Sequence, residues 1–446
     1  MSPVLELFPD TTRVDLDGRL SIAGCDAVSL AERFGTPLYV YDTATILARA
    51  GAYREALAAS YPAGATVCYA AKAYVAPWLL HLIEPEGLGL DVVSGGELHV
   101  AQVAGFPRER VYFHGNNKGE DELAYALDQR VGRIVIDNLD EVARLARLAA
   151  DRGVRQAVLL RIAPGVDVHT HAHLTTGAPD TKFGVSIESG WAEATVRAIL
   201  HQPSLELRGF HAHIGSQIRE IEPYRESIER VFSFAADMRA KVDFIMRELS
   251  PGGGYPVRYV VSDPDVSVVE MIRSVAEAVV TAAGRHGLEL PELTIEPGRS
   301  IIAPAGVALY RVGSVKRGPR TYVAIDGGMA DNIRPTAYGA EYAAILANRA
   351  NDPVGDFPGS APGSDRFAIA GKYCETGDIL IQDVKLPPPR VGDLVAVPVS
   401  GAYHLAMASN YNMAPRPAVV VAADGAARLV RERETYDDLL AHDVRI

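Results

Sequence analysis

The feature that most constrains the fold is a regular alternation of short apolar runs with longer stretches rich in Ala, Leu, Glu and Arg, from about residue 44 to residue 304. Such alternation is typical of βα units around a parallel sheet. Eight apolar runs can be counted, although Arg247 and Glu248 interrupt the seventh: 65–70, 87–93, 110–114, 133–137, 157–162, 205–214, 245–251 and 292–296. Eight strands close a (β/α)8 barrel of the TIM type, so we predict that α/β fold for this part of the chain.

The rest of the chain has a different pattern. A barrel of this type needs about 250 residues, so a chain of 446 residues leaves room for a second domain. After residue 304 the helical period fades, and strand-like runs alternate with Gly and Pro, at 307–312, 321–324, 379–381, 394–399 and 418–422. This pattern predicts a mostly β domain. A further strand-like run precedes the barrel, at 37–41.

Composition argues against several classes of function. The net charge is −12 and the basic residues are scattered, so we expect no binding to nucleic acid. The N-terminal residues carry Glu6 and Asp10 rather than the pattern of a signal peptide, and no run approaches the ~18 apolar residues that span a membrane. The three cysteines, Cys25, Cys68 and Cys374, lack the number and spacing of a disulfide framework or a metal site. We therefore expect a cytoplasmic protein.

Polar or glycine-rich groups follow most of the predicted strands. In a barrel the C-terminal ends of the strands meet at one mouth, where catalytic residues collect. The strand ends of this chain carry several titratable groups and a glycine run: Lys72, Asp91, His114, Arg161, His211, His213, Gly252, Gly253, Gly254, Glu296 and Arg299. Each is a weak signal alone, but their joint placement predicts an active site at this mouth.

Three of these features allow two interpretations. Lys72 could be an ordinary lysine that reaches solvent, or a Schiff-base lysine whose amine is desolvated by the apolar run before it. The three glycines could form a plain turn, or their backbone N–H groups could form a phosphate cradle before a helix. Glu296 and Arg299 could be a surface ion pair, or Glu296 could hold a proton on a pyridine nitrogen.

The histidines suggest a metal site, which we do not favour. His211 and His213 share one face of a strand, and His169, His171 and His173 repeat the same spacing. No carboxylate or cysteine at ligand spacing completes either set, so we expect no metal. Stacking on an aromatic cofactor is the better interpretation of His213.

Several long motifs carry a resemblance to a known family. They are YAAKA, DVVSGGEL, HTH with KFG downstream, HAHIGSQ, EPGRS, DNIRP, CETGD and GAYHLAMASNYN. With these motifs the chain resembles the fold type III (alanine-racemase-like) pyridoxal-phosphate decarboxylases, and within them the diaminopimelate decarboxylases. The resemblance runs almost end to end, from Gly35 to Asn412.

The resemblance implies which residues bind the cofactor, pyridoxal 5'-phosphate. Lys72 would form the Schiff base, His213 would stack on the ring, and Glu296 would pair with the ring nitrogen. Asp91 would lie near Lys72, and Arg161 near the ring. The remaining cofactor contacts, several of them to the phosphate, would come from Ser216, Gly252, Gly253, Gly254, Gly298, Arg299 and Tyr403.

The resemblance also implies the residues that handle the substrate. Arg299 and Arg334 would face a substrate carboxylate, and Cys374 would be the catalytic proton donor. The distal end of the substrate would be completed by Tyr338, Glu375 and Tyr403.

The resemblance further implies how the chain is organised. The pyridoxal-phosphate-binding barrel would span residues 43–305, and the β domain would combine residues 1–42, with the N-terminal strand, and 306–446. Members of the family are homodimers, in which Cys374 and Glu375 would reach into the partner's site. Two departures from the family pattern, Lys372-Tyr373 and Tyr255-Pro256, could alter the pocket mouth without removing a catalytic group.

The expected reaction is the decarboxylation of meso-2,6-diaminopimelate to L-lysine and carbon dioxide, the last step of lysine biosynthesis. The distal end of this substrate is zwitterionic, and Arg299, Arg334 and Glu375 would supply the matching charges. A decarboxylase of ornithine, arginine or carboxynorspermidine is an alternative, but Arg334 would then face a distal cation. Alanine racemase would not use such a distal site. A non-catalytic protein that binds the cofactor could lose Lys72 or Cys374, and both are present.

Overall fold

The computed structural model describes residues 3–166, 182–356 and 365–444. The chain divides into two compact units. Unit 1 comprises Met1–Ala48, Val257–Asp265 and Ile301–Ile446, and unit 2 comprises Arg49–Pro256 and Val266–Ser300. The domain limits expected from the sequence stay a prediction, because compactness does not test which segments fold independently. None of the described helices is both long and apolar enough to cross a membrane.

Unit 2 contains a closed barrel of eight parallel strands. The sheet closes because β8 pairs with β9, and each expected apolar run overlaps one strand. The prediction of a (β/α)8 barrel is therefore confirmed. A two-residue strand, β10 (Val185–Ser186), adds to β9. The barrel strands are β5 (Ala65–Ala70), β6 (Gly89–Val92), β7 (Val111–Phe113), β8 (Arg133–Ile136), β9 (Gln156–Ala163), β11 (Leu205–His211), β12 (Glu248–Gly252) and β13 (Glu292–Ile295).

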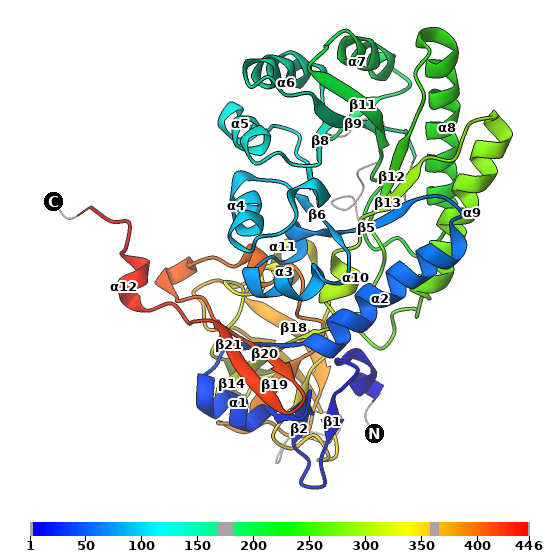
Figure 1. Cartoon of the computed structure of the whole chain (residues 1–446). Helices are drawn as coiled ribbons and strands as arrows, with labels where there is room; N and C mark the ends of the chain where they lie inside the picture. Colours follow the sequence, from blue (N-terminus) through cyan, green and yellow to red (C-terminus); the bar gives the residue numbers. More distant parts are fainter. Residues whose placement is uncertain (1–2, 167–181, 357–364, 445–446) are drawn as a thin grey trace. The chain divides into compact units, whose positions relative to one another are not determined.

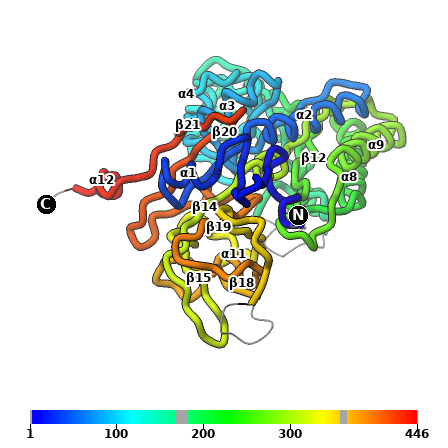
Figure 2. The backbone as a smooth tube through the Cα atoms, turned by 90° about the horizontal axis from the view of Figure 1, so that it is seen from below, coloured from blue at the N-terminus to red at the C-terminus, as the bar shows by residue number. Residues whose placement is uncertain are grey.

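Helices surround these strands, and local capping signals set where several of them begin (Figure 1). The side chains of Ser94, Asn138 and Ser267 each accept a hydrogen bond from the backbone N–H three residues later. Figures 1 and 2 show the two longest of the helices, α8 and α9, side by side. The helices are α2 (Thr43–Ser60), which begins in unit 1, and α3 (Pro77–Ile83), α4 (Gly95–Val103), α5 (Glu120–Asp128), α6 (Leu139–Asp151), α7 (Trp191–Leu200), α8 (Glu222–Val242), α9 (Val268–His286) and α10 (Arg299–Ile302).

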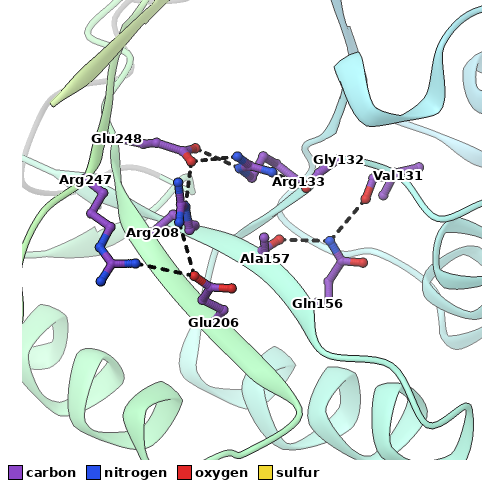
Figure 3. Close-up of polar contacts among 9 residues, drawn as sticks. All are labelled: Val131, Gly132, Arg133, Gln156, Ala157, Glu206, Arg208, Arg247 and Glu248. Atoms are coloured by element: carbon purple, nitrogen blue, oxygen red, sulfur yellow. Dashed lines mark hydrogen bonds and ion pairs between the residues drawn. The ribbon is translucent and has the colours of Figure 1, made fainter. Parts of the chain in front are cut away.

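A buried charge cluster explains the interrupted seventh run. Glu248 is the first residue of β12 and is only 2% exposed. Its carboxylate accepts hydrogen bonds from Nε and Nη2 of Arg133 at 2.7 and 2.6 Å, and from Nε of Arg208 at 2.8 Å (Figure 3). Arg208 and Arg247 also pair with Glu206. A charged residue can therefore begin this strand because partners from other strands neutralise it.

Unit 1 contains a sheet that joins the N-terminal strand to the C-terminal part of the chain. The long strand β14 (Gly306–Lys316) pairs antiparallel with β4 (Leu38–Asp42), and β4 pairs in parallel with β20 (Ala418–Ala423). The predicted mostly β domain that includes the N-terminal strand is thus confirmed. Its core includes Leu38, Val40, Val307, Leu309 and Val420.

The other elements of unit 1 are short. In the described residues, a three-stranded sheet and one α-helix lie before β4: β1 (Arg13–Val14), β2 (Leu20–Ile22), β3 (Cys25–Asp26) and α1 (Ala27–Phe34). The main sheet is completed by β15 (Thr321–Ile325), β16 (Ile345–Leu346), β17 (Arg366–Ala370), β18 (Ile379–Lys385), β19 (Leu394–Val397) and β21 (Ala426–Arg431). Two short α-helices follow Ile325 among the described residues: α11 (Arg334–Tyr338) and α12 (Tyr436–Leu439).

Candidate active site

Lys72 lies at the end of strand β5, in the short 3-10 helix η2 (Ala71–Ala73). Both flanking alanines are buried, whereas Lys72 itself is exposed. The apolar run before it therefore does not bury Lys72. Burial has the largest effect on the pKa values of Asp91 and His213, raising the first and lowering the second. The ammonium of Lys72 also acts on both, in the direction of a lower pKa.

A cluster of polar side chains surrounds the carboxylate of Glu296. Nε2 of His211 donates a hydrogen bond to Oε2 of Glu296 at 3.0 Å, and Oγ of Ser250 donates to Oε1 at 2.5 Å. Nε2 of His114 lies 3.5 Å from Oδ1 of Asp91 and 3.9 Å from Oε1 of Glu296. The rings of His114 and His211 meet edge to face, with their centroids 4.8 Å apart. Five strands thus direct polar groups to one place.

The cluster keeps Glu296 ionised. Burial alone would raise the pKa of Glu296, but the interactions with His211 and His114 and the hydrogen bond from Ser250 outweigh it and hold the pKa below its usual range. Burial lowers the pKa values of His114 and His211 to about 4, so both rings are neutral at pH 7. The negative charge of Glu296 and burial both raise the pKa of Asp91, with burial the larger cause.

The glycine run after β12 approaches neighbouring backbone closely. Gly254 has φ +99°, and a Cβ atom there would lie 2.3 Å from the carbonyl oxygen of Gly215. A Cβ atom on Gly253 would lie 2.0 Å from the carbonyl oxygen of Glu296. Only glycine fits at such positions. The N–H of Gly253 donates to Nδ1 of His213 at 3.2 Å and so orients the imidazole ring.

Three further candidates lie beside these loops. Nη2 of Arg299 donates to Oγ of Ser216 at 3.2 Å. A Cβ atom on Gly298 would lie 3.0 Å from the Cβ and carbonyl oxygen of Ala70, so this glycine lets the loop after β13 pack against the end of β5. Arg299 and Ser216 thus bring a cation and a hydroxyl next to the glycine run, a combination that suits an anionic group.

Arg161 belongs to a second buried group in the barrel. Its guanidinium lies 4.4 Å from the ring centroid of Phe183 and 3.9 Å from Oδ1 of Asp137. Next to Asp137, the fully buried Lys118 and Glu141 form an ion pair at 2.9 Å. These charges compensate one another and can hold Arg161 in a fixed orientation.

The barrel residues fit pyridoxal phosphate. An ionised Glu296 can hold a proton on a pyridine nitrogen, and His213 offers a neutral imidazole for stacking. The glycine backbone, which leaves no room for Cβ atoms, can accept a phosphate at close range. Lys72 offers an exposed amine. The donor set therefore suits this cofactor in charge, shape and chemistry.

The remaining candidates lie in unit 1. Arg334 begins α11 and is buried, with its guanidinium 4.6 Å from the ring centroid of Tyr259. Tyr338 ends the same helix and is exposed. Tyr403 is half-buried and has φ +59°, a left-handed conformation that is unusual for a non-glycine residue.

Cys374 and Glu375 lie on an exposed loop of unit 1. The N–H of Cys374 donates to Oδ1 of Asn412 at 3.0 Å. Oγ1 of Thr336 donates to the carbonyl oxygen of Gly377 at 2.9 Å, so the loop docks on α11. Both side chains are therefore available to a ligand or to another subunit.

The histidines expected to bind no metal fall into two groups. His169, His171 and His173 lie outside the described residues. Of the other pair, His211 has ligand atoms within 4.8 Å of those of His114 and Glu296, an arrangement that could accept a metal ion. His213 is not part of that group.

Sequence reasoning missed several residues of these clusters. Ser250 lies within an apolar strand, and nothing in the sequence marks it as a partner of Glu296. His114 appeared as a strand end without a role.

The chain is similar to known proteins over nearly its whole length. Residues 43–303, more than half of the chain, match the pyridoxal binding domain of the pyridoxal-dependent decarboxylases. The curated diaminopimelate decarboxylase of Bacillus subtilis (strain 168) is 46% identical over 97% of this chain and 97% of its own.

Solved structures show a similar fold. The diaminopimelate decarboxylase of M. jannaschii in complex with L-lysine aligns with a TM-score of 0.89 at 33% identity, covering 98% of both chains. The Helicobacter pylori diaminopimelate decarboxylase, also in complex with L-lysine, aligns with a TM-score of 0.83 at 28% identity, covering 93% of this chain and 98% of its own.

Proposed function

This chain belongs to the pyridoxal-dependent decarboxylase family, and we propose that the residues at the mouth of its barrel bind the cofactor and carry out the catalysis. The enzyme is a carboxy-lyase that converts diaminopimelate to lysine and carbon dioxide, with pyridoxal phosphate as cofactor. The observation that carries the proposed site is the hydrogen-bonded, ionised Glu296 in the same barrel mouth as Lys72.

When bound, pyridoxal phosphate supplies an electron sink for the carbon that loses its carboxylate. In our proposal Lys72 provides the amine that holds the cofactor, and Glu296 holds a proton at the ring nitrogen. His213 stacks on the ring in the orientation fixed by Gly253. Asp91 would lie near Lys72, and Arg161 would lie near the ring.

The phosphate is assigned to the loops after β11, β12 and β13. Their backbone N–H groups and the Ser216 hydroxyl can donate to phosphate oxygens, and Arg299 adds positive charge beside Ser216. The residues proposed for the phosphate are Ser216 and Gly254 from these loops and Tyr403 from unit 1, and Gly252, Gly253, Gly298 and Arg299 complete the cofactor contacts.

The substrate's distal end is assigned by charge. Arg299 and Arg334 would receive carboxylate, Glu375 would receive ammonium, and Tyr338 and Tyr403 would complete the contacts. These charges match meso-diaminopimelate, whose distal centre carries both groups. With ornithine or arginine as substrate, Arg334 would face a cation, an unfavourable pairing.

Cys374 is proposed to return a proton to the carbon after carbon dioxide leaves. We also propose a homodimer in which Cys374 and Glu375 serve the partner's site, which would explain why a catalytic thiol lies on an exposed loop. A cytoplasmic location completes the proposal, and none of the three cysteines forms a disulfide among the described residues.

The most direct experiment offers the purified protein and cofactor three substrates: meso-diaminopimelate, L-ornithine and L-arginine. We expect lysine from the first and no amine product from the other two. Putrescine or agmatine formed at a comparable rate would contradict the assignment of the distal site.

A further inference from the structure

Arg334 is a buried cation without a matching anion. Its side chain is mostly enclosed, and no carboxylate of the described residues lies within ion-pair distance of its guanidinium. It lies 4.6 Å from the ring centroid of Tyr259 and 5.6 Å from that of Tyr342. Within the described part of the chain, its side chain donates a hydrogen bond only to the hydroxyl of Tyr342. Most of its N–H groups therefore remain available to a ligand.

The hydroxyl of Tyr342 is the first link in a buried chain of hydrogen bonds. It lies 2.8 Å from Nε2 of His404, whose Nδ1 lies 3.1 Å from the hydroxyl of Tyr39. That hydroxyl lies 3.0 Å from Oδ2 of Asp331. We call Asp331, Tyr39, His404 and Tyr342 the relay. Its members are at most 3% exposed and all belong to unit 1.

The donor inventory fixes the direction of every bond in the relay. A guanidinium can only donate, so the oxygen of Tyr342 accepts from Arg334. A carboxylate can only accept, so Tyr39 gives its one proton to Asp331 and accepts from Nδ1 of His404. Burial, with a contribution from Arg334, keeps the pKa of His404 well below its usual value. The neutral ring therefore carries its only proton on Nδ1, and Nε2 accepts from the hydroxyl of Tyr342.

The relay therefore joins a cation to an anion through neutral groups. Burial raises the pKa of Asp331 to about 6, against hydrogen bonds from Tyr310, the N–H of Gly328 and Tyr39, so the carboxylate is ionised above pH 7. Every proton in the relay points away from Arg334 and toward Asp331. Aligned hydrogen bonds of this kind polarise one another and hold each group in one orientation.

We propose that the relay positions Arg334 for the carboxylate of the substrate that does not react, and thereby helps the enzyme select amino acids over diamines. Tyr342 and His404 are thus positioning residues, and Asp331 fixes the polarity of the chain. This inference rests on the proposed role of Arg334 as a carboxylate ligand. It adds Tyr39 of strand β4, Asp331 of the DNIRP motif and His404 of the GAYHLAMASNYN motif to the residues that determine specificity.

The test compares two ligands of the holoenzyme, L-lysine and 1,5-diaminopentane, which differ by one carboxylate. Tyr342→Phe removes the hydroxyl and keeps the ring. We expect it to weaken L-lysine binding about tenfold, as for a lost hydrogen bond to a charged group. The affinity for 1,5-diaminopentane should not change. The KM for diaminopimelate should rise by a similar factor, with a smaller change in kcat.

Tyr310→Phe is the matched control. Its hydroxyl is equally buried and donates to Oδ2 of Asp331 at 2.5 Å, but it lies on a side branch that does not lead to Arg334. It should leave the ratio of the two affinities unchanged. His404→Gln interrupts the relay at another point and should reproduce the loss of L-lysine affinity, so the test does not depend on one variant folding.

Arg334→Gln distinguishes a failure of the proposed role of Arg334 from a failure of the relay. If this variant binds both ligands as the wild type does, the proposed role of Arg334 is wrong. If it loses L-lysine selectively whereas Tyr342→Phe and His404→Gln do not, Arg334 binds carboxylate without the relay, and the inference is overturned. Equal weakening of both ligands in the relay variants would show a merely structural role and would also overturn it.

Discussion

The Nε2 atom of His211 lies 3.0 Å from Oε2 of Glu296, and this hydrogen bond ties the carboxylate assigned to the ring nitrogen to a neutral imidazole. The neutral imidazole stabilises the carboxylate by donating this hydrogen bond and brings no positive charge of its own at pH 7. The partnership therefore favours an ionised Glu296 facing the cofactor.

Glu296→Gln should bind pyridoxal phosphate but turn over slowly. The amide keeps the shape of the side chain, yet it cannot hold a proton on the ring nitrogen, so the electron sink is weakened. We expect kcat to fall by roughly 10²–10⁴, the range for a positioned proton-transfer group. Steady-state kinetics and a cofactor titration measure the two effects. Ser250→Ala, which removes one hydrogen bond to Glu296, should show a smaller loss, and a wild-type kcat in Glu296→Gln would refute the assignment.

Gly254→Ala should reduce cofactor affinity. The new Cβ would lie 2.3 Å from the carbonyl oxygen of Gly215, at a φ of +99°, so the two loops must separate. Since these loops are assigned to the phosphate, we expect the Kd for pyridoxal phosphate to rise tenfold or more, measured by fluorescence or calorimetric titration. Gly284→Ala in α9, where a Cβ would meet nothing within 4 Å, is the control. Unchanged affinity in Gly254→Ala would remove this glycine from the phosphate site.

Glu248→Ala should destabilise the barrel without changing catalysis. The variant leaves Arg133 and Arg208 without their buried carboxylate (Figure 3), at a cost of about 3 kcal/mol in the free energy of unfolding. Glu248 is the first residue of β12, whereas Lys72 follows the last residue of β5. Because the strands are parallel, the two residues lie at opposite ends of the barrel, so kcat and KM should stay the same in the folded enzyme. Glu206→Ala, which removes a more exposed pair, should cost less than 1 kcal/mol in urea denaturation. Equal costs would contradict the role of burial.

The cofactor-free protein should lose stability below pH 6.5. Burial lowers the pKa values of His114 and His211 to about 4, whereas histidine in an unfolded chain titrates near 6.5. Between these values the unfolded chain binds protons that the folded chain does not. Stability therefore falls as the pH is lowered through this window, and these two groups have no effect above it.

Across the whole window, from pH 6.5 down to about pH 4, each histidine lowers the free energy of unfolding by roughly 3 kcal/mol. Urea denaturation at pH 7 and pH 5 measures the part of this loss that falls above pH 5, roughly 2 kcal/mol for each histidine. His211→Phe should reduce the difference between the two pH values, whereas replacement of the exposed His81 by Gln should not. A difference that is the same in all three proteins would place the acid sensitivity elsewhere.

The barrel could be predicted from the sequence because its strands are buried on both faces and read as continuous apolar runs. Strand β12 was the weakest of the eight, since a charged residue begins it. The hydrogen bond that neutralises Glu248 comes from Arg133, 115 residues away in the sequence. Nothing local to the run at 245–251 reveals that partner.

The residues of the candidate site were predictable only where a reactive side chain follows the end of a strand. Lys72, His213 and Glu296 stand at such ends, and their residue types suit the cofactor. The relay was not predictable, because its members become partners only through the fold. Tyr39 looks like any aromatic residue of an apolar strand, yet it contacts His404, 365 residues away.

Cys374→Ala should keep cofactor binding and slow turnover by roughly 10²–10⁴, because the carbon that has lost carbon dioxide would lack its proton donor. Lys72→Ala should abolish both the visible absorption of the covalently bound cofactor and turnover. The alternative is that Cys374 only packs in the core as a small residue, as most free cysteines do. Its exposure on a loop docked to α11 argues against that alternative.

A mixture of the two variants tests the shared site. In a homodimer that pairs Lys72 of one subunit with Cys374 of the other, half of the randomly exchanged dimers carry one intact site, so about a quarter of wild-type activity should return. If each site is complete within one subunit, a heterodimer contains only damaged sites and no activity returns. Differently tagged subunits show whether exchange has occurred, and mixing each variant with wild type controls for inhibition by the mutant chains. Demonstrated exchange without recovered activity would reject the arrangement in which Cys374 serves the partner.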